Sequence, residues 1–162
     1  MHAPDAARPA ARTVVVLGGL TMFGPLSLDL YLPALPQLAD DLNASASAAQ
    51  LSITACLIGL AVGQLVAGPL SDRLGRKRPL MIGLVAYLLA SVACALAPSV
   101  TVLIVLRLIQ GLGGAAGIVI SRAIARDLYS GSALMIFFSR LLLVAGLAPV
   151  LAPILGGQLS RI

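Results

Sequence analysis

The sequence contains few charged or aromatic residues and few residues that bind metals. Only 10% of its 162 residues are charged and 4% are aromatic, with no tryptophan, one histidine and two cysteines. Soluble domains carry about 25% charged residues, so an ordinary soluble domain is excluded. Cys56 and Cys94 both lie inside apolar runs and are too few for a zinc site or a disulfide framework. His2 lies in a polar tail, and we expect no metal and no bound cofactor.

Hydrophobic residues dominate the chain instead. They make up 59% of the sequence, and the mean hydropathy is +1.03, which excludes a disordered chain. The net charge of +5 and a pI near 10.0 are typical of nucleic-acid-binding proteins. However, most basic residues lie in short stretches between long apolar runs. The composition therefore predicts an integral membrane protein that binds the lipid bilayer and no nucleic acid.

Five apolar segments approach the length of about 20 residues that a membrane-spanning helix requires. They cover residues 13–35, 48–70, 79–96, 100–120 and 133–155, after a polar tail of residues 1–12. Because the first segment is long and is interrupted by Asp29 and by prolines, we expect no cleaved signal peptide. The pattern predicts an all-α membrane fold of five helices.

The distribution of basic residues predicts the orientation of these helices. With the N-terminus inside, eight of the eleven Lys and Arg residues are cytoplasmic: Arg8, Arg12, Arg73, Arg76, Lys77, Arg78, Arg122 and Arg126. Arg161 then falls outside, and Arg107 and Arg140 lie within spans. Since Lys and Arg accumulate on the cytoplasmic side, we expect a cytoplasmic N-terminus. The chain stops directly after the fifth segment, and we expect it to be truncated.

Three ionisable residues lie inside the predicted spans, where a charge costs about 2.5–3.5 kcal/mol. At 1.5 Å per residue, Asp29 and Arg107 lie at similar depths, roughly 9 and 10 Å below the outer surface. They could pair if their helices are neighbours, with Gln110 one turn below Arg107. One interpretation is a water-accessible cavity with a titratable carboxylate, and the other is a static ion pair that fixes helix packing. Arg140 enters from the opposite side and has no obvious acidic partner.

Glycine and proline patterns are a weaker signal. Glycines four residues apart in the second and fourth segments favour close helix packing; these pairs are Gly59 with Gly63 and Gly113 with Gly117. In the fifth segment, Pro149 and Pro153 are followed by Gly156 and Gly157. Each proline removes one backbone hydrogen bond and favours a kink, which suits either a moving or a static bent helix.

Residues 68–78, GPLSDRLGRKR, lie between the second and third segments. They resemble the cytoplasmic signature of the major facilitator superfamily, G-x-L-[AS]-D-[RK]-x-G-[RK]-[RK]. A merely basic inside loop would account for the arginines but not for Asp72 and Gly75 at this spacing. Gly68 would permit tight helix contact, and Gly75 would permit a sharp turn.

Three further stretches resemble motifs of the same superfamily. Residues 28–36, LDLYLPALP, are similar to the first-helix signature of drug exporters of the Bcr/CflA type, which include phenicol and bicyclomycin pumps. Residues 106–114, LRLIQGLGG, resemble the fourth-helix motif associated with proton coupling. Residues 148–157, APVLAPILGG, resemble the fifth-helix antiporter motif, with Ala152-Pro153 in place of the usual Gly-Pro.

The resemblance implies a proton-coupled antiporter of twelve helices that exports small hydrophobic drugs across the inner membrane. It implies that Asp29 is the acid that responds to proton and substrate, with Arg107 and Gln110 as coupling residues. Tyr31 and Arg140 become candidates for the cavity wall. It also implies a cytoplasmic gate formed by Gly68, Asp72, Arg73, Gly75 and Arg76, in which Arg122 and Arg126 interact with Asp72.

Two alternatives to a complete transporter follow from the sequence. The chain supplies five of the twelve helices, so it would lack the C-terminal half and would not transport alone. The alternative is a non-transporting membrane fragment of a disrupted or partly sequenced transporter gene. An intramembrane enzyme is disfavoured, because the spans contain no histidine, no pair of aspartates and no Gly-x-Ser-x-Gly elbow.

Overall fold

A computed structural model describes residues 10–143 and 146, apart from the side chains of residues 23–26. The described residues form helices and no strands, which confirms the predicted all-α fold. The elements are α1 (Ala11–Tyr31), the 3-10 turn η1 (Leu32–Ala34), α2 (Leu35–Asp41), α3 (Ala46–Leu74), α4 (Lys77–Ala95) and α5 (Val100–Leu128). A further apolar helix covers Gly131–Leu143.

Three of these helices, α3, α4 and α5, are long and apolar enough to cross a membrane. The segment from α1 through α2 counts as a fourth span if its two halves, Ala11–Met22 and Ser27–Asp41, are one element bent by 47°. The Gly131–Leu143 helix is shorter, and the rest of the fifth predicted span lies outside the described residues. The described part therefore agrees with a multi-pass membrane fold.

Two predicted connections are helical in the structure. The stretch 36–47 contains most of α2, whose first turn accommodates Pro36 because the amide nitrogens there need no helical partner. The stretch after residue 120 continues α5 for eight residues to Leu128. Apolar length predicts where a helix can cross the membrane, but Ala, Arg and Leu are strong helix formers and extend the helix beyond that limit.

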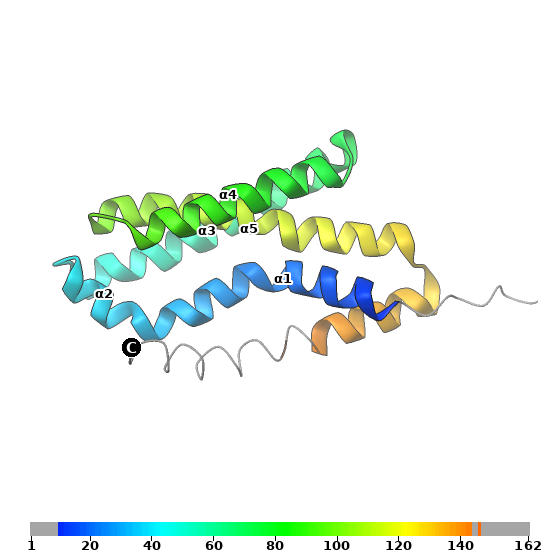
Figure 1. The fold of residues 1–162 in the computed structure, drawn as a ribbon, viewed down its shortest axis with the longest axis horizontal. Helices are drawn as coiled ribbons and strands as arrows, with labels where there is room; N and C mark the ends of the chain where they lie inside the picture. The colour runs from blue at the N-terminus through cyan, green and yellow to red at the C-terminus, as the bar shows by residue number, and fades with distance from the viewer. Residues whose placement is uncertain (1–9, 144–145, 147–162) are drawn as a thin grey trace, which may run out of the picture.

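Helix α5 lies at the centre of the bundle, with α3, α4 and α1 packed around it (Figure 1). In the most apolar 18-residue stretch of α5, 61% of the residues are buried inside the bundle. In the corresponding stretches of α3 and α4, only 28% and 17% are buried. The exposed faces of α3 and α4 carry many large apolar side chains, as expected for surfaces that face lipid. Helix α5 is therefore the element on which side chains from several helices converge.

Glycines of α5 allow three neighbouring helices to approach its backbone. A Cβ atom on Gly111 would lie 2.1 Å from the carbonyl oxygen of Cys56 on α3. On Gly113 it would lie 2.7 Å from that of Gly83 on α4, and on Gly117 it would lie 2.5 Å from that of Leu20 on α1. Small residues permit this close approach where lipid supplies no hydrophobic driving force between helices.

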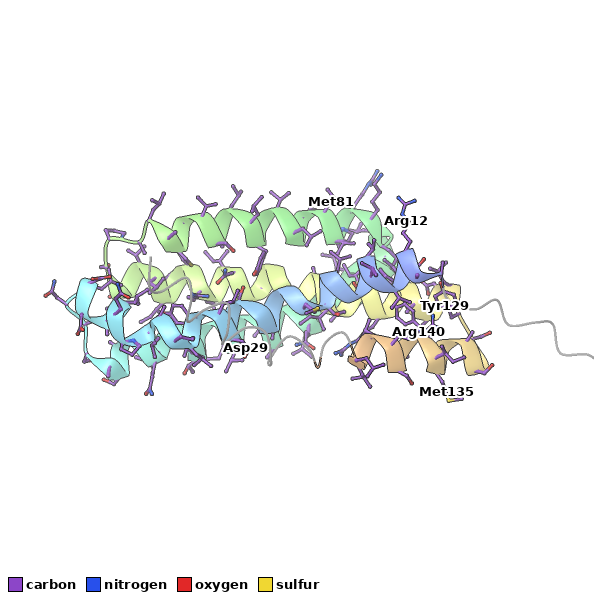
Figure 2. The ribbon with its side chains drawn as sticks, turned by 60° about the horizontal axis from the view of Figure 1, so that its bottom comes forward. Arg12, Asp29, Met81, Tyr129, Met135 and Arg140 are labelled. Carbon is purple, nitrogen blue, oxygen red and sulfur yellow. The ribbon has the colours of Figure 1, made fainter. Side chains whose placement is uncertain are left out.

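The end of α5 near Leu128 packs against α1 and the Gly131–Leu143 helix. Val14 and Leu17 of α1 contact Ala125 of α5 and Phe137 and Leu141 of the last helix, and all five are buried. Figure 2 shows Arg12, Tyr129 and Arg140 at this end of the bundle, with Asp29 farther along α1. This apolar cluster fixes the order of the helices at the end that carries most of the basic residues.

Candidate functional site

Arg107 lies in the interior of the bundle. Its side chain projects from α5 and is only 8% exposed. The guanidinium carbon lies 3.7 Å from the centre of the Tyr31 ring on α1, a cation–π contact. Its Nη1 atom donates a hydrogen bond to Oε1 of Gln110 at 2.9 Å. An aromatic face and an amide oxygen therefore stabilise this charge.

These contacts belong to a larger group of side chains, which we call the polar cluster: Tyr31, Ser52, Tyr87, Ser91, Arg107 and Gln110. The hydroxyl groups of Tyr31 and Ser52 are 2.7 Å apart, which joins α1 to α3. Nε2 of Gln110 donates to Oγ of Ser91 on α4 at 2.7 Å. Oγ of Ser91 donates to the Tyr87 carbonyl oxygen at 2.7 Å. The polar cluster thus connects four helices, and Arg107 is its one charged member.

One atom of Arg107 remains without a partner. Its Nε is buried and makes no hydrogen bond within the described part of the chain. No carboxylate of residues 10–143 forms an ion pair with Arg107. A buried charge without an opposite charge is unfavourable unless other groups stabilise it. Arg107 is therefore a buried cation with no carboxylate partner among the described residues.

The predicted contact between Asp29 and Arg107 is not formed in this structure. Their helices are neighbours, as the prediction required, and Arg107 meets α1 at Tyr31, two residues beyond Asp29. Residues two apart on a helix do not share a face, so α1 presents the Tyr31 ring to Arg107 in place of Asp29. Asp29 is half-buried, and among the described residues it has no ion-pair partner. The two charges lie at a common level without touching.

A second group of charges lies where α3 ends and α4 begins. We call it the charged cluster: Asp72, Arg76 and Asp127. Arg76 Nε donates to Oδ2 of Asp127 at 2.8 Å, and its Nη1 pairs with Oδ1 of Asp72. Nη1 also donates to Oγ of Ser71 at 2.8 Å. The hydrogen bond to Asp127, together with Asp72, raises the pKa of the Arg76 guanidinium above its ordinary value.

The signature glycines differ in what they do. Gly75 ends α3 with a φ of 81°, a conformation that favours glycine, so the predicted sharp turn is confirmed. At Gly68, the predicted tight helix contact is wrong. A Cβ atom there would meet only Cγ1 of Val119, at an ordinary 3.6 Å. The close approach of α3 to α5 occurs at Gly59, Gly63 and Gly111 instead.

A partly open cavity of about 350 Å³ lies beside the charged cluster, between α3 and α5. It is lined by Gly68, Asp72, Arg76, Val119, Arg122, Ala123, Arg126 and Asp127. Arg122 and Arg126 line the same cavity as Asp72, as the predicted gate requires. The basic partner of Asp72 and of Asp127 is nevertheless Arg76, and neither Arg122 nor Arg126 forms an ion pair among the described residues.

The other predicted site residues occupy different places. Arg140 is exposed on the Gly131–Leu143 helix, at the end of the bundle where Arg12 lies and apart from Asp29 (Figure 2). Arg73 is exposed near the end of α3. Tyr31 is 7% exposed and covers Arg107. The predicted antiporter-motif residues, Pro149, Pro153, Gly156 and Gly157, lie outside the described residues.

The sequence reading missed the hydroxyl groups of the polar cluster. Ser52, Tyr87 and Ser91 lie in apolar segments and carry no charge, so a search for ionisable residues within the spans does not find them. Their signal was spacing: Tyr87 and Ser91 are one helical turn apart, on the face of α4 that meets α5. A search for hydroxyl groups at helical spacing within spans would have found this pair.

Comparison with known proteins extends this description. Residues 17–162 match the family model described as Major Facilitator Superfamily. An uncharacterized MFS-type transporter, YdgK of Bacillus subtilis (strain 168), is 49% identical over 144 residues, which cover 89% of this chain and 36% of YdgK.

Two relatives are named for drug resistance. A bicyclomycin resistance protein homolog of Haemophilus influenzae is 38% identical over 91% of this chain and 37% of its own length. A chloramphenicol resistance protein of Pseudomonas aeruginosa is 38% identical over 90% of this chain and 35% of its own length. The chain therefore spans about a third of the length of these curated relatives.

Proposed function

Because the chain belongs to the Major Facilitator Superfamily, we propose that its helices form part of a secondary transporter that exports small hydrophobic drugs in exchange for protons. Relatives named for resistance to bicyclomycin and chloramphenicol support a drug of that kind as substrate. The observation that carries the proposal is the buried Arg107, without a carboxylate partner among the described residues, beside the helix that bears Asp29. A permanent positive charge in the interior would attract a carboxylate that approached it.

Proton coupling in this proposal uses Asp29. Asp29 is half-buried, whereas the other described aspartates are exposed. Protonation of Asp29 removes one negative charge from a region of low dielectric constant, while Arg107 keeps its charge. The loss changes the electrostatic free energy of any conformation that brings the two groups together. Proton binding would in this way bias the conformation of the bundle.

The orientation we propose places the N-terminus and the charged cluster in the cytoplasm. Arg76 and the flanking Arg73, Lys77 and Arg78 lie at one end of the bundle, and the positive-inside rule assigns that end to the cytoplasm. Asp40 and Asp41 at the end of α2 would then lie outside. Chemical labelling of single cysteines at positions 41 and 77 in intact cells tests this orientation. Labelling at position 77 in place of position 41 would contradict it.

The test of the coupling mechanism is Asp29→Asn in a transporter of the relatives' length that carries these helices. We expect the variant to lose drug resistance and proton-driven efflux, since asparagine cannot exchange a proton. Asp40→Asn is the matched control, because it removes the same charge from an exposed helix end, and it should retain efflux. Unchanged pH-dependent efflux in Asp29→Asn would remove Asp29 from the mechanism.

We also propose that residues 1–162 do not transport by themselves, since they span about a third of each relative. Alternating access requires one bundle to move against another around a central site. We expect cells that produce residues 1–162 alone to show no drug resistance above cells with an empty vector. Resistance above that control would show that these residues transport without a second bundle.

A further inference from the structure

The cavity beside the charged cluster is lined by two arginines that form no ion pair with the described residues. Within residues 10–143, Arg76 accounts for the ion pairs of both Asp72 and Asp127. Arg122 and Arg126 line the same cavity and have no hydrogen-bond or ion-pair partner in the described part of the chain. The cavity lining carries three arginines and two carboxylates, a net charge of +1, and Arg122 and Arg126 are its cations without a carboxylate partner among the described residues.

The spacing of these arginines suits a phosphate group. Arg122 and Arg126 are four residues apart on α5, which places their Cβ atoms about 5–6 Å apart on one face of the helix. Each guanidinium can donate two parallel hydrogen bonds to phosphate oxygens. Two such groups on one wall of a cavity of about 350 Å³ can bind a single phosphodiester from the same side.

Besides its charged residues, the cavity has an uncharged part of its lining, formed by Gly68 on α3 and by Val119 and Ala123 on α5. Gly68 and Val119 precede the charged residues of their helices and lie nearer the middle of the membrane-spanning segments. Gly68 has no side chain, and the nearest atom to a Cβ built there is 3.6 Å away, so the wall is open at this point. A ligand held by the two arginines can therefore extend an apolar chain toward the bilayer. Free phosphate has no such chain.

From this geometry we propose that the cavity between α3 and α5 binds the headgroup of an anionic phospholipid, with Arg122 and Arg126 holding the phosphate. Basic pockets between membrane-spanning helices on the cytoplasmic side are suited to such headgroups. Arg76 also lines the cavity, and its ion pairs with Asp72 and Asp127 hold its side chain in place. This proposal does not depend on transport or on the role of Asp29.

The test is lipid retention by the purified chain in neutral detergent, measured by native mass spectrometry. The probes are phosphatidylglycerol and phosphatidylcholine with identical acyl chains. The cavity variant is Arg122→Gln with Arg126→Gln. The control variant, Arg73→Gln with Arg78→Gln, removes the same charge from exposed positions outside the cavity. Circular dichroism verifies the helix content of each variant.

We expect the chain to retain phosphatidylglycerol in preference to phosphatidylcholine. The cavity variant should lose about 30-fold in retention of phosphatidylglycerol, since each basic residue near the lipid contributes about fivefold. The control should lose less than about fivefold. The pair Arg122→Lys and Arg126→Lys keeps both charges and should retain most of the binding. This conservative pair keeps the test informative if the glutamine pair fails to fold.

Three outcomes would overturn the proposal. Equal losses in the cavity and control variants would show general attraction to positive charge. No preference for phosphatidylglycerol over phosphatidylcholine would show that no anionic site exists. Displacement of the lipid by millimolar inorganic phosphate would identify a site for the free anion in place of a lipid.

Discussion

Arg107 and Arg76 lie in different regions of the same bundle, and their charges are stabilised by different groups. Arg107 is buried and contacts an aromatic ring and an amide oxygen, with no carboxylate of the described residues beside it. Arg76 is 28% exposed and contacts two carboxylates, whose own exposures are 63% and 52%. The interior therefore carries a positive charge without a counter-ion, whereas the solvated end carries one cation between two anions.

The difference teaches what each site can do. At the solvated end, water screens the charges, so forming or breaking an ion pair changes the free energy little. In the interior, the addition or removal of one negative charge changes the free energy substantially, because the dielectric constant is low. In the proposed mechanism, a negative charge brought to or removed from Arg107 would therefore affect the bundle more than the same change in the charged cluster.

The largest expected effect comes from breaking the helix contact on which both regions depend. In Gly111→Val, a new side chain would start 2.1 Å from the Cys56 carbonyl oxygen, a backbone atom that cannot rotate away. We expect the free energy of unfolding to fall by more than about 3 kcal/mol, because overpacking against backbone forces α3 away from α5. Thermal unfolding in detergent, followed by circular dichroism, measures the loss.

Gly68→Ala is the control for this variant. It adds a methyl group on the same pair of helices at a point where the nearest atom is 3.6 Å away. We expect stability to be unchanged or to rise by up to about 1 kcal/mol, because alanine favours a helix over glycine. A loss in Gly68→Ala as large as that in Gly111→Val would contradict the assignment of the close contact.

The next largest effect comes from Tyr31 in the polar cluster, where two substitutions separate the contribution of its aromatic ring from that of its hydroxyl group. Tyr31→Leu removes the aromatic face from Arg107 and should cost about 2 kcal/mol, the value expected for a desolvated cation–π contact. Tyr31→Phe keeps the ring and loses only the hydrogen bond to Ser52, so it should cost about 1 kcal/mol. Unfolding in detergent at several salt concentrations gives both values. Equal losses in the two variants would show that the ring does not stabilise Arg107.

The sequence was sufficient to predict the helices, because lipid requires every backbone polar group to be satisfied within a helix. It left open whether the helices of Asp29 and Arg107 are neighbours, and in the structure they are. The pairing of those two side chains was a different matter. Depth along a helix follows from residue number, but the direction of a side chain depends on how the helix is rotated. That rotation places Tyr31 against Arg107.

The charged cluster shows the same limit at the other end. The signature predicted that Asp72, Arg76, Arg122 and Arg126 meet, and they do line one cavity. Which cation pairs with which anion could not be predicted, since residue 127 falls between the predicted spans 100–120 and 133–155. Asp127 instead lies on the last turn of α5, because that helix continues to Leu128. Competition among nearby arginines for two carboxylates is settled by distances that sequence spacing does not contain.

The smallest expected effect is that of Asp127→Asn, and it sharpens the contrast between the two regions. The substitution removes a carboxylate that accepts from Arg76 Nε at 2.8 Å and from its Nη2 at 3.4 Å, while the pair with Asp72 remains. Because these groups are exposed, the unfolding midpoint should fall by less than in either Tyr31 variant. At 1 M salt the Debye length is about 3 Å, so the difference between Asp127→Asn and the unmodified chain should vanish. The loss in Tyr31→Leu should persist at 1 M salt, since its charge is buried and poorly screened. The opposite result, in which salt abolishes the Tyr31→Leu effect and leaves the Asp127→Asn effect intact, would contradict this comparison. It would show that the charge of Arg107 is screened by solvent and that the Arg76–Asp127 ion pair is not.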